Sequence, residues 1–233
     1  RSVTTQRSQV DVPILLTGAV DRLVLKPNYE VQKANMLYAH DGLGVTQARL
    51  KGEAAAGPFS VEMVTETGAP RRKLTADIPD ASSAASAFLG LNNIDGGRLS
   101  VEAKLPRASL DGPLQGTARI EDFQLVNAPA LAQMLSMASL TGLGNVLGGE
   151  GIKFDRFEVP FSLQDNLLQI REARVSGPAI GLTGDGDMNL NTMAVDFDGV
   201  LVPAYSANSV IGSIPLIGDL LVGNKGEGIF ALS

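Results

Sequence analysis

The chain has 233 residues and a formal net charge of -6 at pH 7, with one histidine and no cysteine. The acidic balance argues against a nucleic-acid binder, which needs clustered lysine and arginine to neutralise phosphates. The absence of cysteine excludes disulfides, thiolate metal sites and thiol catalysis, and one histidine cannot build a multi-histidine metal site. The length is ample for one large β unit or for two domains.

Alternation of apolar and polar residues with a period of two is the recurring pattern along the chain. Such alternation predicts β-strands that have one dry and one wet face. It appears at residues 59–63, 98–105, 157–164 and 180–190. Its dry positions are Phe59, Val61, Met63, Leu99, Val101, Ala103, Leu105, Phe157, Val159, Phe161, Leu163, Ile180, Leu182, Met188 and Leu190.

Turn-forming residues separate these runs. Clusters of glycine, proline, asparagine and aspartate follow residues 40, 56, 67, 110, 164, 176 and 189. Such clusters connect antiparallel strands, and we expect about ten or more strands in all.

Three segments break the alternation and are expected to be helical. Residues 79–91 include the potential cap Asp80, and residues 128–143 follow the potential cap Asn127. Residues 205–222 form a third, more broken helical pattern.

The first two helical segments end in related phrases. Gly90-Leu91, Asn93-Ile94 and Gly96-Gly97 align with Gly142-Leu143, Asn145-Val146 and Gly148-Gly149 at a constant offset of 52 residues. A third unit repeats Gly149-Glu-Gly-Ile152 as Gly226-Glu-Gly-Ile229. This internal repetition predicts a sheet built by recurrence, with helices at its ends.

Two polar patterns could be mistaken for sites. His40 precedes Asp-Gly, and we interpret it as a solvated turn residue and not as a general base. Asp185, Asp187, Asn189 and Asn191 superficially resemble a calcium loop, but Leu190 and Asp196 stand where that loop needs glycine and glutamate. Alternation along one strand face explains these four residues equally well.

Two further patterns have ordinary structural interpretations. The glycine string at residues 142–148 follows a helical segment, so it fits a helix end and turn better than a dinucleotide loop. The basic run Arg71-Arg-Lys73 could contact anionic lipid headgroups, but a solvated strand edge is the preferred interpretation.

The dry faces are the remaining candidate for function. They form a core if they close on one another, and they form a groove for acyl chains if they stay open. Each buried methylene contributes about 0.8 kcal/mol, so a lipid tail could gain on the order of 10 kcal/mol without any polar site. The residues expected to contact lipid are Phe59, Val61, Met63, Leu99, Val101, Phe157, Val159, Phe161, Leu168 and Ile170.

The most apolar helical candidate lies at residues 210–222. It could cap the end of the sheet, which is the preferred interpretation, or dip into a membrane interface. Its apolar residues are Ile211, Ile214, Leu216, Ile217, Leu220 and Leu221. Because Pro203, Asn208, Pro215 and Asp219 interrupt the surrounding apolar stretch, we do not expect a spanning helix there.

Several phrases resemble one family. They are Phe88-Leu-Gly-Leu-Asn-Asn-Ile-Asp-Gly-Gly-Arg-Leu99, the stretch at 127–154, Val202-Pro-Ala-Tyr205, Asn208, Ile214-Pro-Leu-Ile-Gly-Asp-Leu-Leu221 and Gly226-Glu-Gly-Ile-Phe230. In order and separation they resemble the C-terminal region of the bacterial AsmA-like family, relatives of YhdP and TamB. The resemblance spans residues 73–233.

The resemblance implies a β-rich protein of the periplasm that is membrane-associated. It implies lipid transport between the inner and outer membranes and a role in outer-membrane integrity. The chain begins with Arg1, so we expect it to be a fragment whose inner-membrane anchor lies outside this sequence. Phospholipid or another acyl lipid is the expected partner, and the outer membrane or its proteins are a further expected partner.

Together these patterns predict a mainly β fold. We expect a curved antiparallel sheet that forms an incomplete barrel or groove, with two or three short helices at the strand ends. The chain is expected to be one β-rich fragment, with possible sub-units at 1–79 and 80–233. We expect no enzyme activity, cofactor or metal, because no paired base and nucleophile can be assembled. The alternative function is a structural or interaction module that assists outer-membrane protein assembly.

Overall fold

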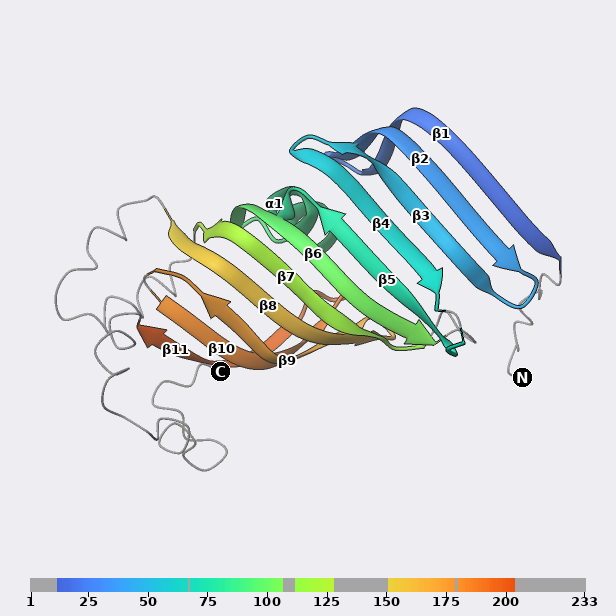
Figure 1. Cartoon of the computed structure of the whole chain (residues 1–233). Helices are drawn as coiled ribbons and strands as arrows, with labels where there is room; N and C mark the ends of the chain where they lie inside the picture. Colours follow the sequence, from blue (N-terminus) through green and yellow to red (C-terminus); the bar gives the residue numbers. More distant parts are fainter. Residues whose placement is uncertain (1–11, 67, 107–111, 128–150, 179, 204–233) are drawn as a thin grey trace.

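A computed structural model describes residues 12–66, 68–106, 112–127, 151–178 and 180–203 (Figure 1). These residues form one antiparallel sheet of eleven strands, in which each strand pairs with its neighbours in sequence. The sheet is groove-like and not closed into a barrel. The mainly β prediction is therefore confirmed. The strands are β1 Pro13–Lys26, β2 Tyr29–Asp41, β3 Val45–Ala54, β4 Gly57–Thr65, β5 Arg71–Ile78, β6 Ile94–Pro106, β7 Leu114–Leu125, β8 Ile152–Gln164, β9 Leu167–Ser176, β10 Ile180–Asn189 and β11 Val195–Pro203.

The strand registers separate the sheet into an apolar and a polar face. Residues directly opposite each other in an antiparallel pair share a face. Val61 pairs with Ala76, Ala76 with Val101, and Val101 with Ala118. We call the face that carries these residues the inner face, and the opposite one the outer face. The possible sub-units at 1–79 and 80–233 meet between β5 and β6. These two strands pair with each other, so the sheet is continuous there.

Bulges bend the sheet. Lys33 in β2 has a positive φ of 47°, and the register between β2 and β3 shifts beside it. Glu172 in β9 has a φ of 52°, and the registers to both β8 and β10 shift there. Extra residues of this kind increase local twist and bend the strand. Figure 1 shows the resulting curvature, with β9 to β11 passing behind β8.

The buried core lies along one edge of the sheet. One cluster contains Tyr29, Val31, Ala34 and Phe59, from the starts of β2 and β4. A second cluster contains Phe123, Ile152, Phe154 and Ile180, from the end of β7 and the starts of β8 and β10. Odd-numbered strands end and even-numbered strands begin at this edge, so both clusters share it. We call this end of the strands the helix edge, because the helical connection between β5 and β6 lies there. It is distinct from the two edge strands of the sheet, which are β1 and β11 among the described residues.

The helical prediction for residues 79–91 is confirmed. A short α-helix, α1 Ala81–Ala84, continues as one π-helical turn, η1 Ala85–Leu89. The Asp80 carboxylate accepts a hydrogen bond of 3.1 Å from the Ser83 amide, and Gly90 ends the helix in the left-handed conformation. Ala84 belongs to the core cluster that contains Tyr29 and Phe59, so the helix packs on the inner face (Figure 1).

Several sequence predictions lie outside the described residues. They include the helices at 128–143 and 205–222, the glycine phrases at 142–149 and 226–229, and the cap or membrane residues Ile211, Ile214, Leu216, Ile217, Leu220 and Leu221. Among the helices that the structure describes, none has the length and apolarity needed to cross a bilayer.

Arg72 corrects one sequence interpretation. The basic run at residues 71–73 was interpreted as a solvated strand edge, but Arg72 is only 2% exposed. It lies on the inner face because it pairs with Thr65 and with Leu105. Its Nε donates to the Val45 carbonyl at 2.9 Å and its Nη1 donates to the Pro106 carbonyl at 3.4 Å. These bonds tie the ends of β3 and β6 to β5 at the edge opposite the helix.

We expect Arg72→Ala to lower the free energy of unfolding by on the order of 3 kcal/mol, because the Val45 carbonyl and the part-buried Pro106 carbonyl lose a charged donor. The matched control is Arg71→Ala, whose exposed side chain pairs with Glu66 on the outer side at 3.0 Å. The control should cost under about 0.5 kcal/mol. Urea unfolding measures both, and equal effects of the two variants would contradict the bridging role of Arg72.

Candidate functional site

The structure brings all ten residues predicted to contact lipid onto the inner face. The register places Phe59, Val61 and Met63 of β4 on the same side as Leu99 and Val101 of β6. The same side carries the predicted residues of β8 and β9, because Ala118 pairs with Val159 and Phe161 with Ile170. The positions from β8 and β9 are Phe157, Val159, Phe161, Leu168 and Ile170.

A row of small side chains crosses the middle of the inner face. We call it the small-residue row; it runs from β4 to β8 through Val61, Ala76, Val101, Ala118 and Val159. It continues beyond the register shift between β8 and β9 to β11 as Ala173, Gly184 and Gly199. Seven strand steps at about 4.8 Å give it a length of about 34 Å. The row on its helix-edge side has larger side chains: Phe59, Ile78, Leu99, Ile120, Phe157, Val175 and Leu182.

Beside this row, Gly116 of β7 also presents no side chain to the inner face. Gly116 pairs with Ala103 on one side and with Phe161 on the other. A Cβ atom at Gly116 would lie 2.2 Å from the Glu102 carbonyl oxygen and 2.5 Å from the Ala103 Cβ. Only glycine therefore fits there without moving the β6 backbone. The inner face thus has small side chains across its middle and bulky side chains along the helix edge.

The inner face is partly accessible. Val61, Val101, Phe161, Leu168 and Ile170 are half-buried. Phe59 and Val159 are buried, and Phe59 lies in the core cluster with Ala84 of the helix. In the described part of the chain all strands belong to one sheet, so no second sheet packs against this face.

The outer face is polar and has ion pairs between neighbouring strands. Arg119 and Glu158 are 2.9 Å apart, Arg156 and Glu121 are 3.3 Å apart, and Lys51 and Glu62 are 3.8 Å apart. These side chains are substantially exposed, so each pair contributes little to stability. Their importance is that they keep the outer face hydrated.

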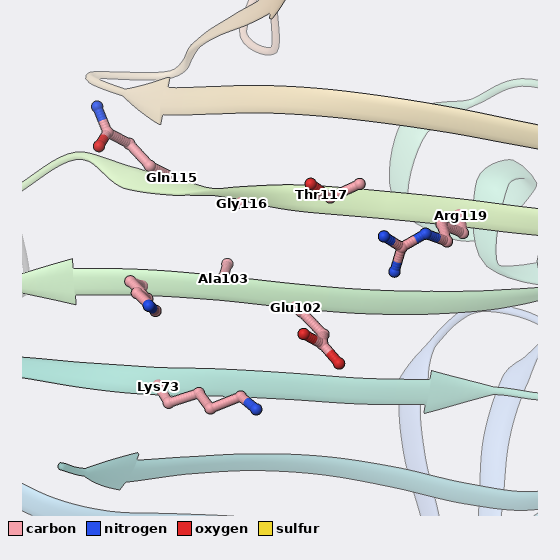
Figure 2. Close-up of a pocket in the computed structure, with 8 residues that line it drawn as sticks. Lys73, Glu102, Ala103, Gln115, Gly116, Thr117 and Arg119 are labelled. Atoms are coloured by element: carbon pink, nitrogen blue, oxygen red, sulfur yellow. The ribbon is translucent and has the colours of Figure 1, made fainter. Parts of the chain in front are cut away.

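One hollow on the outer face has a volume of about 180 Å³. Figure 2 shows that its lining comes from three neighbouring strands, with Lys73 on β5, Glu102 on β6, and Thr117 and Arg119 on β7. Glu102 is exposed and the other three are half-buried. This hollow belongs to the hydrated outer face.

The other polar motifs serve the fold. His40 Nδ1 accepts a 3.0 Å hydrogen bond from the Gly42 amide and so helps the turn after β2. Asp185 accepts from the Glu172 amide at 2.8 Å, and Asp187 pairs with Arg171 at 3.2 Å. Within the described residues, no group of three or more histidine and acidic side chains could hold a metal ion.

Inner-face residues of the first three strands were missed by the sequence reasoning. Leu16, Met36 and Leu50 extend the apolar face toward β1, since Met36 pairs with Gly18 and with Leu50. The bulge at Lys33 breaks the alternation in this region, and β1 is apolar on both sides around Leu15 and Leu16. Only the pairing partners reveal which side chains face inward.

No protein-family model, no curated protein and no solved structure matches this chain. Its function is therefore inferred from its own residues and their arrangement.

The pair Arg119 and Glu158 predicts a pH effect. The hydrogen bond and positive charge of Arg119 lower the pKa of Glu158 below its ordinary value of 4.5. A lowered carboxyl pKa stabilises the fold above the ordinary value, and this contribution is lost as pH falls through the folded-state pKa.

We therefore expect Glu158→Gln to lower the melting temperature slightly at pH 7. The difference from the unsubstituted protein should shrink as the pH falls below 4.5. Thermal unfolding across this pH range measures it. A difference that stays constant would show that Arg119 does not stabilise the charged form of Glu158.

Proposed function

We propose that this chain is a lipid-binding module of the periplasm that takes part in phospholipid movement between the inner and outer membranes. The observation that carries the proposal is the continuous apolar inner face of a single-layered, open sheet. Core residues of a closed sandwich would be sealed by a second sheet. Here Val61, Val101 and Phe161 keep part of their surface exposed.

The energetics suit an acyl chain. Burial of each methylene contributes about 0.8 kcal/mol, and a tail lying along the small-residue row would remain in contact with apolar side chains throughout. Val101, Val159 and Ile170 are aliphatic, which suits a flexible hydrocarbon better than a sugar or a nucleobase that needs aromatic stacking. No polar site is needed to hold such a tail.

The two-faced sheet suits transfer through water. The charged outer face stays hydrated while the inner face shields the tail, so lipid could cross an aqueous compartment without exposing its hydrocarbon. The resemblance to the AsmA-like family supports the periplasmic location and an anchor in the inner membrane.

Phospholipid recovered with the purified protein tests the proposal. We expect the unsubstituted chain to carry phospholipid that mass spectrometry detects, and to rebind it after delipidation. Val101→Asp should reduce the bound amount at least tenfold, because a carboxylate in contact with a hydrocarbon tail loses hydration. The matched control is Ser100→Asp, on the adjacent position of β6 but on the outer face opposite Arg119.

Circular dichroism should show that both variants fold. The absence of bound lipid from the unsubstituted chain would contradict an inner-face binding site. An equal change in bound lipid in Val101→Asp and Ser100→Asp would contradict it as well.

A second candidate is an interaction module that assists outer-membrane protein assembly. The observation in its favour is β1, a 14-residue strand that pairs only with β2 among the described residues. Its Leu15 and Leu16 point to opposite faces and are 69% and 61% exposed. The first part of β1, residues 13–20, carries no charge. An apolar edge segment of this kind can pair with another chain. This candidate predicts a protein that is free of lipid and that binds an unfolded outer-membrane protein.

A further inference from the structure

The hydroxyl group of Tyr29 is buried without a hydrogen-bond partner. The residue is 4% exposed, and its Oη is the buried side-chain polar atom that lacks a partner within the described structure. Buried hydroxyl groups in proteins normally have a partner, and leaving one unsatisfied is destabilising. Because phenylalanine would fill the same space without this cost, the hydroxyl requires an explanation other than packing.

The surroundings of Tyr29 are apolar. Its ring meets Phe59 edge-on with centroids 6.3 Å apart, and Phe88 edge-on at 5.5 Å. Val31, Ala34 and Ala84 complete the cluster. Burial and the negative charge of Asp80 raise the pKa of Tyr29, so its hydroxyl stays protonated and can donate. Asp80 itself accepts from the amide and the hydroxyl of Ser83.

The segment α1–η1 covers this cluster and presents mostly small side chains to it. Ala81, Ala84 and Ala85 are its buried residues, and each offers a single methyl group to the sheet. A hydrogen bond of 2.9 Å from the Ser82 hydroxyl to the Ile94 carbonyl ties the helix to β6. Phe88, the largest apolar side chain of the segment, remains 48% exposed.

The covered cluster is continuous with the proposed lipid face. Phe59 is two residues from Val61 on the same side of β4, and Val61 begins the small-residue row. A hydrocarbon tail that extends along this row toward β4 would meet the alanine side chains of α1. The tail could replace these methyl groups on the inner face, because both are apolar.

We propose that Tyr29 and the segment α1–η1 form a covered subsite for an ester-bearing lipid. The lipid displaces the helical segment, its hydrocarbon takes the place of the alanine side chains, and the Tyr29 hydroxyl donates a hydrogen bond to an ester carbonyl. The subsite rests on the proposed lipid-binding function and assigns the class of lipid, a glycerolipid with acyl esters.

Tyr29→Phe tests the hydrogen bond. Two probes are used on the delipidated full chain: a phosphatidylcholine with a fluorescent acyl tail, and diphenylhexatriene, a hydrocarbon without hydrogen-bonding groups. We expect Tyr29→Phe to weaken the phosphatidylcholine Kd by about three- to tenfold, which corresponds to one hydrogen bond, and to leave the diphenylhexatriene Kd unchanged. The melting temperature of the ligand-free variant should be equal or higher.

Unchanged phosphatidylcholine affinity in Tyr29→Phe would overturn the subsite while leaving the proposed function intact. An equal loss for both probes would also overturn it, because it would indicate damage to packing. If neither probe binds the unsubstituted protein, the proposed function itself fails, and the subsite fails with it.

A single engineered thiol tests displacement of the helix. The chain has no cysteine, so Ala84→Cys places one thiol beneath the helix, and Ala103→Cys places one on the inner face away from the helix. Both alanines are buried, at 4% and 3% exposure. We expect phosphatidylcholine to accelerate alkylation of Cys at position 84 at least fivefold and to slow alkylation at position 103. Slower or unchanged alkylation at position 84, with position 103 protected, would show that lipid binds without moving the helix and would overturn the covered subsite.

Discussion

Strand register is the constraint on which this structure depends: the two-residue alternation of apolar and polar side chains keeps the same sides across eleven strands. A slip of one residue in any pairing would send the apolar residues of all later strands to the outer face. The register avoids this from Met36 of β2 to Phe197 of β11, with shifts only at bulges. The outcome is one layer with a hydrated side and an apolar side, and that asymmetry is the physical basis of the proposed lipid binding.

Connection geometry places the helical cover. In a sheet of sequential antiparallel strands, successive connections alternate between the two edges. The connection from β5 to β6 therefore leaves from the same edge as those from β1 to β2 and from β7 to β8. The core clusters around Tyr29 and Phe154 lie along that edge, where bulges such as the one at Lys33 also bend the sheet. Arg72 and its carbonyl partners hold the opposite edge. The two edges are thus stabilised differently, one by apolar packing and one by buried polar bonds.

Much of the strand pattern could be predicted from the sequence, and the reasons are local. The alternation at Phe59, Val101 and Phe157 reports directly which side chains share a face, and Asp80 with its downstream alanines specifies a capped helix. Arg72 was misread because it stands within three consecutive basic residues, although Leu74, Ala76 and Ile78 of β5 continue its side of the alternation. Burial of this charged residue also depends on carbonyls more than 25 positions away in sequence. The small-residue row could not be predicted, since its members come from eight strands whose registers depend on bulges. The orphan hydroxyl of Tyr29 is equally invisible in a sequence, because it is a property of packing.

The central claim is that the inner face is open to a hydrocarbon chain. Photo-crosslinking tests it most directly: benzoylphenylalanine is placed at position 101 or at position 100, the protein is irradiated with phospholipid vesicles, and the adduct is identified by mass spectrometry. The structure predicts a lipid adduct from position 101, on the inner face, and none from position 100, on the outer face. Adducts of equal yield from both positions, or none from position 101 in a folded protein, would contradict the claim.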